Sequence, residues 1–333
     1  MSTCTPLQAP FPWFGGKRTI APAVWERFGE IKNYVEPFFG SGAVLLQRPM
    51  TFKSIETVND KDRYLSNFWR AVRSDPEQVA FYADCPVNEA DLEAKHYWLV
   101  TTGAQSLVQG LVDPDWFDPK VAGWWVWGIC SWIGSEWCAG TGPWAVGDQG
   151  FYNYKKLCPE VAGQGIKRQL PHLGNAGQGI NRKRPQEITR KDFILSWMLR
   201  LSERLRDTRV CCGDWTRVCG PSVTIKQGLT GVFLDPPYGL KATRSKVYNE
   251  DDFSIADSVK QWAVENGNNP LMRIALCGYD TEHDMPSDWT TLPWKAVGGY
   301  GSQGQGRGRE NAARETLWFS PHCLKIATLF ERG

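Results

Sequence analysis

The sequence lacks the hydrophobic segments that mark membrane and secreted proteins. No stretch approaches the roughly 18 apolar residues that a membrane span needs. The first residues, MSTCTPLQAPFPWFGGKR, do not show the basic and then apolar layout of a signal peptide. We therefore expect a soluble, cytoplasmic protein.

Two short motifs are also missing. The chain has no CxxC pair among its 10 cysteines, which favours reduced core thiols over disulfides or zinc. A metal site built from Cys130, Cys138, Cys158 and His172 is the alternative, and we expect no metal. The turn after the first predicted strand also lacks the GxGxxG fingerprint of dinucleotide binding, which disfavours a nicotinamide oxidoreductase.

An excess of charge of one sign is absent too. The net charge is only +2, so a nucleic-acid-binding surface must come from local clustering of basic residues. What the chain does have is length and apolar content. With 333 residues, 42% of them hydrophobic, and 17 Trp, it can bury a sizeable core, and this composition argues against disorder of the whole chain.

Strand and helix patterns occupy the two ends of the chain but not its middle. Predicted strands lie at 33–39, 54–60, 209–214, 231–237, 273–280, 314–320 and 325–331, and predicted helices at 42–48, 61–73, 192–207 and 254–267. The middle is instead rich in Trp, Gly and basic side chains. This order predicts one α/β sheet, formed by residues 1–75 and 191–333, into which a second domain, residues 76–190, is inserted.

The segment GVFLDPPY, residues 231–238, sets Asp235, Pro236, Pro237 and Tyr238 behind a predicted buried strand. In open parallel sheets, ligands bind beyond the carboxyl ends of the strands. The prolines stiffen the loop and remove N–H donors, so that the Asp235 carboxylate and a carbonyl oxygen of the loop can each accept one N–H of an exocyclic amine. Tyr238 offers a ring face for a planar base. An ordinary Asp-Pro-Pro turn is the alternative.

A glycine-bearing turn follows the first predicted strand. In YVEPFFGSG, residues 34–42, Glu36 ends the strand, and Gly40 and Gly42 precede the predicted helix. Glycines let a ligand approach the backbone closely, which suits a nucleoside cofactor. Glu36 would repel a pyrophosphate, so a cationic ligand such as S-adenosylmethionine fits better than NAD. A plain strand-turn-helix corner is the alternative.

Acidic residues also end two other predicted strands. Asp60 follows Gly40 by 20 residues, where an acidic side chain commonly accepts hydrogen bonds from ribose hydroxyls. The alternative role for Asp60 is to cap the helix predicted at 61–73. Asp214 and Trp215 can hold an adenine ring by a hydrogen bond and a ring contact, unless they are a turn aspartate beside a core tryptophan.

The order of these motifs is specific. FPWFGGK (11–17), VEPFFGSG (35–42), an acidic residue after the second strand, a long middle and DPPY (235–238) together resemble the Dam-type family, the D12 class or alpha group, of adenine-N6 DNA methyltransferases. The match covers roughly the first 75 and the last 140 residues, and the middle departs from the pattern. The resemblance implies S-adenosylmethionine as cofactor, double-stranded DNA as partner, and a Rossmann-like methyltransferase sheet with an inserted target-recognition domain.

The resemblance also implies roles at matching positions. Trp13, Lys17, Pro37 and Ser41 would line the cofactor pocket, and the methionyl part of the cofactor would lie among Glu36, Phe39, Gly40 and Gly42. Asp60 would bind the ribose, and Asp214 and Trp215 the adenine moiety. Asp235 and the Pro236 carbonyl would bind the target amine of an extruded adenine, with Tyr238 stacked on the base. Trp215 stands where such proteins often have Phe.

Two segments of the middle are candidates for DNA contact. Seven tryptophans between 116 and 144 form either a base-stacking surface or the core of a small module. Residues 154–191 hold nine Lys and Arg against two Glu, with Asn and Gln among them, a mixture suited to phosphates and base edges, unless the loop is merely solvated. We expect DNA contacts from Lys167, Arg168, Asn181, Arg182, Lys183 and Arg184, and a second phosphate contact from Arg307, Arg309 and Arg314.

The main hypothesis is therefore a site-specific DNA adenine-N6 methyltransferase. Methylation of cytosine N4 or of RNA adenine is the alternative within the same chemistry. A non-catalytic DNA-binding protein that keeps the fold is the alternative from another class. The target site and the biological role, such as protection against a nuclease, stay open, and a monomer is the default.

Overall fold

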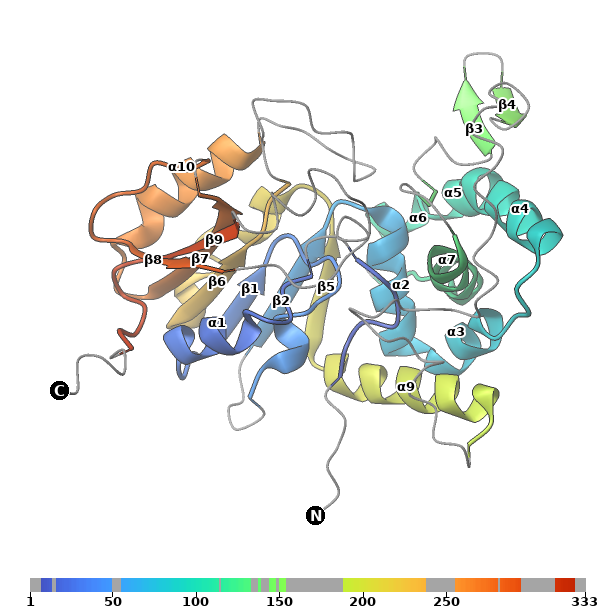
Figure 1. Ribbon diagram of the computed structural model, residues 1–333, viewed down its shortest axis with the longest axis horizontal. Helices are drawn as coiled ribbons and strands as arrows, with labels where there is room; N and C mark the ends of the chain where they lie inside the picture. Colours follow the sequence, from blue (N-terminus) through green and yellow to red (C-terminus); the bar gives the residue numbers. More distant parts are fainter. Residues whose placement is uncertain are drawn as a thin grey trace.

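The computed structural model is shown in Figure 1. It describes residues 7–13, 16–49, 55–113, 115–132, 137–138, 144–147, 150–153, 188–237, 255–280, 282–294 and 315–326. In this part of the chain, every helix is too short or too polar to cross a membrane.

A seven-stranded sheet in the order β5-β2-β1-β6-β7-β9-β8 forms the centre of the molecule. The strands are β1 (Asn33–Glu36), β2 (Ile55–Asp60), β5 (Thr208–Cys212), β6 (Thr230–Leu234), β7 (Met272–Tyr279), β8 (Thr290–Pro293) and β9 (Glu315–Phe319). The first five strands of this order are parallel to one another, and β9 runs antiparallel between β7 and β8. The predicted α/β, Rossmann-like sheet is thus confirmed.

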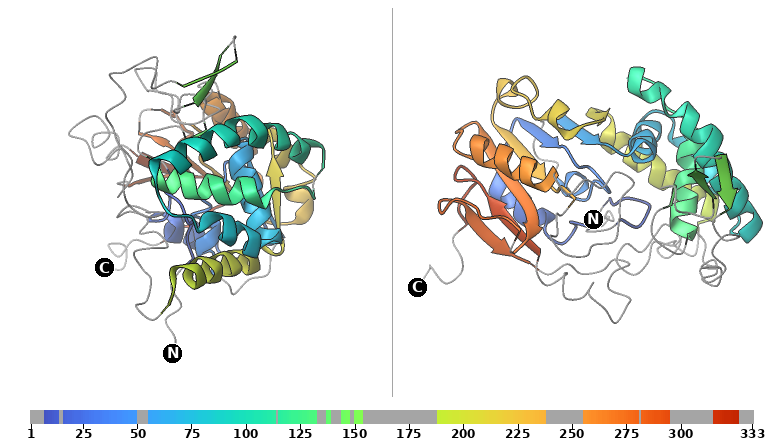
Figure 2. Two further views of the ribbon diagram at one scale, coloured as in Figure 1. Left: turned by 90° about the vertical axis from the view of Figure 1, so that its right-hand side faces the viewer. Right: turned by 90° about the horizontal axis from the view of Figure 1, so that it is seen from above.

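Both faces of the sheet are covered, which explains why its central strands are apolar throughout. In β6, Phe233 packs into one hydrophobic cluster, whereas Val232 and Leu234 pack into the other. Helices α1 (Ala21–Phe28), α2 (Arg63–Ser74) and α9 (Arg190–Leu205) contribute to the first cluster, and α10 (Ile255–Gly267) to the second. The result is a three-layer arrangement (Figures 1 and 2).

Helices from the middle of the chain lie beyond the β5 edge of the sheet (Figures 1 and 2). They are α3 (Pro76–Ala83), α4 (Glu89–Trp98), the π-helical turn η2 (Leu99–Gly103), α5 (Ala104–Ser106), α6 (Gln109–Val112) and α7 (Pro119–Ser131), followed by a hairpin of β3 (Trp144–Gly147) and β4 (Gly150–Asn153). Although β2 and β5 are paired neighbours, this whole segment comes between them in the chain.

The tryptophan-rich segment contributes to the main core. Trp125 and Trp127 on α7 and the nearby Trp137 are buried in the same cluster as the side chains of α2. Gly123 lets α7 lie directly on α3, since a Cβ there would be 2.3 Å from Tyr82 Cβ. Of the two interpretations, a base-stacking surface or a core, these three rings therefore support the core. That core is shared with the sheet and does not belong to a separate module.

The prediction of a helix at 42–48 is wrong. Its described residues form only a 3₁₀ turn, η1 (Leu45–Gln47). Pro49 explains the short element, because a proline disfavours helical backbone in the residue before it. Arg48 is accordingly extended, with ψ 133°.

The C-terminal strand pair is also different from the prediction. The partner of β9 at its outer side is β8, not the segment 325–331. Residues 325 and 326 are not in a strand, and the rest of that segment lies outside the described residues. The sequence signal for β8 is weak, since TTLP is a short, mostly exposed edge strand that ends in proline.

Candidate active site

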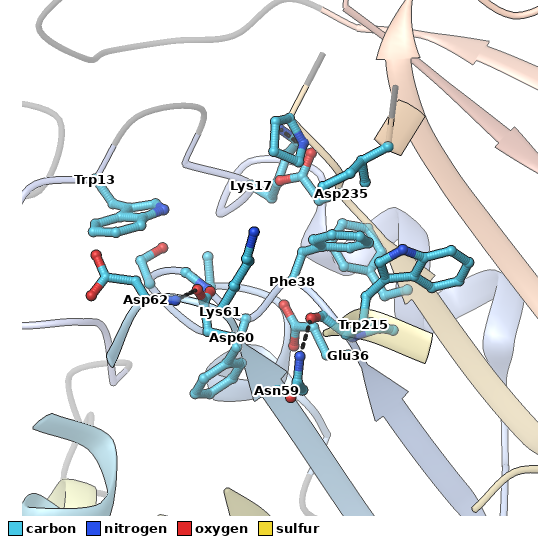
Figure 3. Close-up of a pocket in the computed structure, with 18 of the residues that line it drawn as sticks. Trp13, Lys17, Glu36, Phe38, Asn59, Asp60, Lys61, Asp62, Trp215 and Asp235 are labelled. Atoms are coloured by element: carbon cyan, nitrogen blue, oxygen red, sulfur yellow. Dashed lines mark hydrogen bonds and ion pairs between the residues drawn. The ribbon is translucent and has the colours of Figure 1, made fainter. Parts of the chain in front are cut away.

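A pocket opens at the carboxyl ends of β1, β2, β5 and β6 (Figure 3). Its empty space, open mouth included, is ≈ 900 Å³, and it is lined by Trp13, Lys17, Glu36, Pro37, Phe38, Phe39, Gly40, Ser41, Ala43, Asn59, Asp60, Lys61, Asp62, Gly213, Asp214, Trp215, Phe233, Asp235, Pro237 and Ile255. The chain leaves β1 for β2 and β5 on one side and returns to β6 on the other. This is the switch point at which open α/β sheets bind ligands.

The turn after β1 brings the backbone close to the pocket. Gly40 has φ 48° and Gly42 has φ 62°, conformations that side chains rarely adopt. A Cβ on Gly40 would lie 2.5 Å from Trp13 Nε1, so Trp13 rests directly on the glycine backbone. On the other side of the turn, Trp69 Nε1 on α2 donates to the Gly40 carbonyl at 3.0 Å.

Side chains of β2 tie the neighbouring loops together. Asp60 accepts the backbone N–H of Gly40 at 2.9 Å and that of Asp62 at 3.0 Å. Asn59 donates to the carbonyls of Pro37 at 3.1 Å and Gly213 at 3.0 Å. The loops after β1, β2 and β5 therefore form one cross-linked floor. The cap of α2 is Asp62, whose side chain accepts from the first turn of the helix, so capping is not the role of Asp60.

The pocket is electrostatically suited to a cation. Glu36 is buried and accepts a hydrogen bond from Tyr34 Oη at 2.8 Å. Burial raises the pKa of Glu36 well above its usual value, and the negative charges of Asp235 and Asp60 raise it further. Burial likewise raises the pKa of Asp60 to about 7. A positively charged ligand would offset the unfavourable free energy of ionising these two carboxyls.

An aromatic wall faces the floor. The rings of Phe38 and Trp215 stack with centroids 6.2 Å apart and an interplanar angle of 29°, and they lie side by side in Figure 3. Trp215 is fixed from behind by an edge contact with Trp262. Asp214, which is exposed, accepts the backbone N–H of Thr216 at 3.0 Å. This wall offers a flat apolar surface beside an acceptor.

Asp235 follows β6 directly and faces Lys17, which precedes α1 (Figure 3). Lys17 Nζ is 3.0 Å from Asp235 Oδ1 and 3.6 Å from Glu315 Oε2 at the start of β9. Asp235 and the glycine turn thus line the same cavity, because β6 and β1 are hydrogen-bonded neighbours.

The structure brings most of the sequence-predicted site residues into this one pocket. Of the predicted residues that it describes, Gly42 and Pro236 do not line the pocket; both are buried in the turns that shape it. Tyr238, the six predicted DNA contacts Lys167, Arg168, Asn181, Arg182, Lys183 and Arg184, and also Arg307, Arg309 and Arg314 lie outside the described residues.

Sequence reasoning missed several lining residues. These are Phe38, Ala43, Asn59, Lys61, Asp62, Gly213, Phe233 and Ile255. Asn59, Lys61 and Asp62 adjoin Asp60, so their proximity to the strand end was a usable signal. Lys61 extends into the space between Trp13 and Phe38 (Figure 3). For Glu315, which contacts Lys17 without lining the pocket, no local signal exists.

The sheet order and the switch-point pocket define a Rossmann-like methyltransferase fold. Residues 13–102 match the model of the D12 class N6 adenine-specific DNA methyltransferase family. The match indicates a DNA adenine-N6 methyltransferase, a class of enzyme that in general uses S-adenosylmethionine. A comparison with curated proteins gave no match. The family match includes the glycine turn and Asp60, whereas Asp214, Trp215 and Asp235 lie beyond it.

Proposed function

We propose that the enzyme transfers a methyl group from S-adenosylmethionine, bound in the pocket, to N6 of an adenine flipped out of double-stranded DNA. The observation that carries this proposal is the shared cavity of Asp235 and the glycine turn at Gly40, at the ends of two adjacent strands. In this proposal the acceptor for the target amine adjoins the turn that binds the cofactor, which is the geometry that in-line transfer needs.

The pocket has features that fit this cofactor. Gly40 has no Cβ, so the Trp13 ring lies directly against its backbone at the pocket, and the carboxyls of Glu36 and Asp60 favour a cation. In our proposal, Glu36, Phe39, Gly40 and Gly42 surround the methionyl part, Asp60 accepts from the ribose, and Asp214 and Trp215 hold the adenine. Phe38 joins them as the second ring of the wall. The cofactor pocket is also lined by Trp13, Lys17, Pro37 and Ser41. When bound, S-adenosylmethionine supplies a methyl group on a positively charged sulfur.

The chain's own contribution to transfer is to orient the amine. The Asp235 carboxylate and the Pro236 carbonyl each accept one N–H of the target, which aims the nitrogen lone pair at the methyl carbon. The bond from the methyl carbon to the target nitrogen would form as the carbon–sulfur bond breaks with its electron pair left on sulfur, and Asp235 or water would take the proton that the positively charged amine then loses. Asp235 need not be a strong base, because positioning and charge stabilisation carry most of the rate. Tyr238 would stack on the base.

Access to N6 requires that the adenine leave the duplex, because the amine is otherwise engaged in a base pair. We propose residues 76–190 as the target-recognition domain, interrupting a catalytic domain of residues 1–75 and 191–333. Their position between the paired strands β2 and β5 supports this division. Lys167, Arg168, Asn181, Arg182, Lys183 and Arg184 are proposed to contact phosphates and base edges of a specific site, with the enzyme acting as a monomer.

The test is methylation followed by nucleoside digestion. Labelled S-adenosylmethionine is incubated with the enzyme and duplex DNAs of varied sequence, and the digest is separated. We expect label in 6-methyladenine, in a sequence-dependent manner. Label in N4-methylcytosine, or in adenine of RNA but not of DNA, would replace the proposed substrate, and no label in any nucleic acid would contradict methyl transfer altogether.

A further inference from the structure

A buried lysine at the edge of the pocket lies between two carboxylates. Lys17 Nζ is within ion-pair distance of Asp235, at 3.0 Å, and of Glu315, at 3.6 Å. Only 5% of the Lys17 side chain and 7% of the Glu315 side chain are exposed, against 22% for Asp235. Asp235 lines the pocket and Glu315 does not. A bound amine can therefore reach the first carboxylate directly, but the second only through the lysine.

Glu315 comes from a strand far along the chain from both other members. It begins β9, and the antiparallel register sets it opposite Tyr279, the last residue of β7. The Glu315 carbonyl also accepts the backbone N–H of Trp294 at 2.9 Å, and the Lys17 ammonium lies 5.6 Å from the centre of that indole ring. Lys17 thus lies close to both the Glu315 carboxylate at the start of β9 and the indole ring of Trp294, which follows β8.

We propose that Glu315 is a positioning residue for methyl transfer, acting through Lys17 on Asp235. This inference rests on the proposed function, and it names a group that the motifs do not include. With Glu315 ionised, the lysine divides its attraction between two carboxylates, and Asp235 remains available to the amine. The three groups together carry one net negative charge, which stabilises the positive charge that develops on the target nitrogen.

Neutralising Glu315 changes both effects. Lys17 then attracts Asp235 more strongly, because the competing Glu315 carboxylate is gone. The Asp235 carboxylate is thereby drawn away from the target amine. The three groups also become neutral as a set. Since the lysine is buried, these charges are screened much less than on the surface. Both changes slow transfer without altering the cofactor floor formed by Asn59 and Asp60.

Single-turnover rates of methyl transfer test the first half of the proposal. At saturating cofactor and DNA, we expect Glu315→Gln to be slower than the wild type by roughly tenfold or more, less than the roughly hundredfold lost with a group that contacts the reacting atoms, because Glu315 acts through Lys17. Glu315→Asp should recover part of the rate, and the affinities for cofactor and DNA should stay within about threefold of the wild type. Glu265→Gln, an exposed glutamate on α10, is the matched control. An unchanged rate in Glu315→Gln would overturn the proposal.

A double-mutant cycle tests whether the effect passes through the lysine. Lys17→Met removes the intermediary, so adding Glu315→Gln to it should cost less rate than Glu315→Gln costs the wild type. If Glu315→Gln instead slows the Lys17→Met enzyme as much as it slows the wild type, Glu315 acts by another route and the proposal is wrong.

Urea unfolding tests the interaction of Lys17 with Asp235 and Glu315 independently of methyl transfer. Asp235→Asn and Glu315→Gln together deprive the buried lysine of both carboxylates, so the double variant should lose more stability than the sum of the single variants. Additive losses would contradict the three-group cluster whatever the enzyme does. Coupled losses in a protein that transfers no methyl group would contradict the proposed function instead, and with it the catalytic part of this proposal.

Discussion

The backbone N–H of Gly40 donates to the Asp60 carboxylate at 2.9 Å. This bond joins the turn after β1 to the acidic end of β2, so the two motifs act as one structural unit. A change in either residue is therefore expected to affect the same ligand site, which makes the pair a good place to start testing the account.

Substituting alanine for Gly40 should weaken cofactor binding. The residue has φ 48°, and the new Cβ would meet Trp13 Nε1 at 2.5 Å, so the turn must shift. We expect a loss of about 1–3 kcal/mol of stability, as is usual for strained backbone, and at least a tenfold weaker affinity for S-adenosylmethionine by calorimetry. Gly220→Ala is the control, because no atom lies within 4 Å of a Cβ there. Equal affinities in the two variants would contradict the prediction.

Asp60 should make the ligand-free enzyme less stable as the pH rises. Its pKa in the folded protein is about 7, above the value of 3.8 for an unperturbed Asp. The native state therefore holds its proton more tightly than the unfolded state, and this contribution to stability is present below about pH 4 and is lost as the pH rises to 7.

The measurement is the free energy of unfolding between pH 5 and pH 8. Relative to Asp60→Asn, which cannot ionise, the wild type should lose stability over this range, by on the order of 2 kcal/mol. The comparison isolates Asp60 from other titrating groups, such as Glu36. Parallel curves for the two proteins would show that Asp60 is already ionised at pH 5.

Phe38 should contribute to cofactor affinity by stacking. Its ring lies against Trp215 in the pocket and is partly exposed, so truncation removes a stacking surface with little loss of core. Base stacking on an aromatic ring contributes about 1–3 kcal/mol. Phe38→Leu is therefore expected to raise the Kd for S-adenosylmethionine by about tenfold or more, whereas Phe81→Leu, on an exposed part of α3, should leave it unchanged. An unchanged Kd in Phe38→Leu would show that the Phe38 ring does not contact the cofactor.

The contact between α3 and α7 should be intolerant of a side chain. A Cβ at Gly123 would lie 2.3 Å from Tyr82 Cβ and 2.8 Å from the Val79 carbonyl oxygen. We expect Gly123→Ala to lower the free energy of unfolding by about 1–3 kcal/mol, because α3 and α7 must move apart to make room for the added methyl group. If α7 belonged to a separately folding module, its loss would appear as a distinct transition. A single shifted transition is expected, because α2 and α7 share one core.

The sheet could be predicted because each buried strand carries its own apolar signal. Thr230–Leu234 is buried on both faces and reads as a strand from composition alone. The edge strand Thr290–Pro293 has no such signal, and the helix predicted at 42–48 failed where Pro49 limits it.

The site divides in the same way. Glu36, Asp60 and Asp235 could be named from sequence because each stands at a strand end, where parallel sheets gather ligands. Phe38 was missed because it lies beyond the end of β1 at Glu36, where strand alternation no longer predicts which of two neighbouring phenylalanines stacks on Trp215. Glu315 was out of reach, since its contact with Lys17 depends on β9 running antiparallel beside β7.

The most direct test of the central claim is the methyl-transfer rate of Asp235→Ala, saturated with cofactor and DNA. The account predicts a loss of at least a hundredfold, because the amine loses the acceptor that orients it. Cofactor affinity, DNA binding and the unfolding transition should remain measurable, and Asp257→Ala, an exposed aspartate on α10, should transfer at the wild-type rate. Transfer by Asp235→Ala at a rate near that of the wild type would contradict the account.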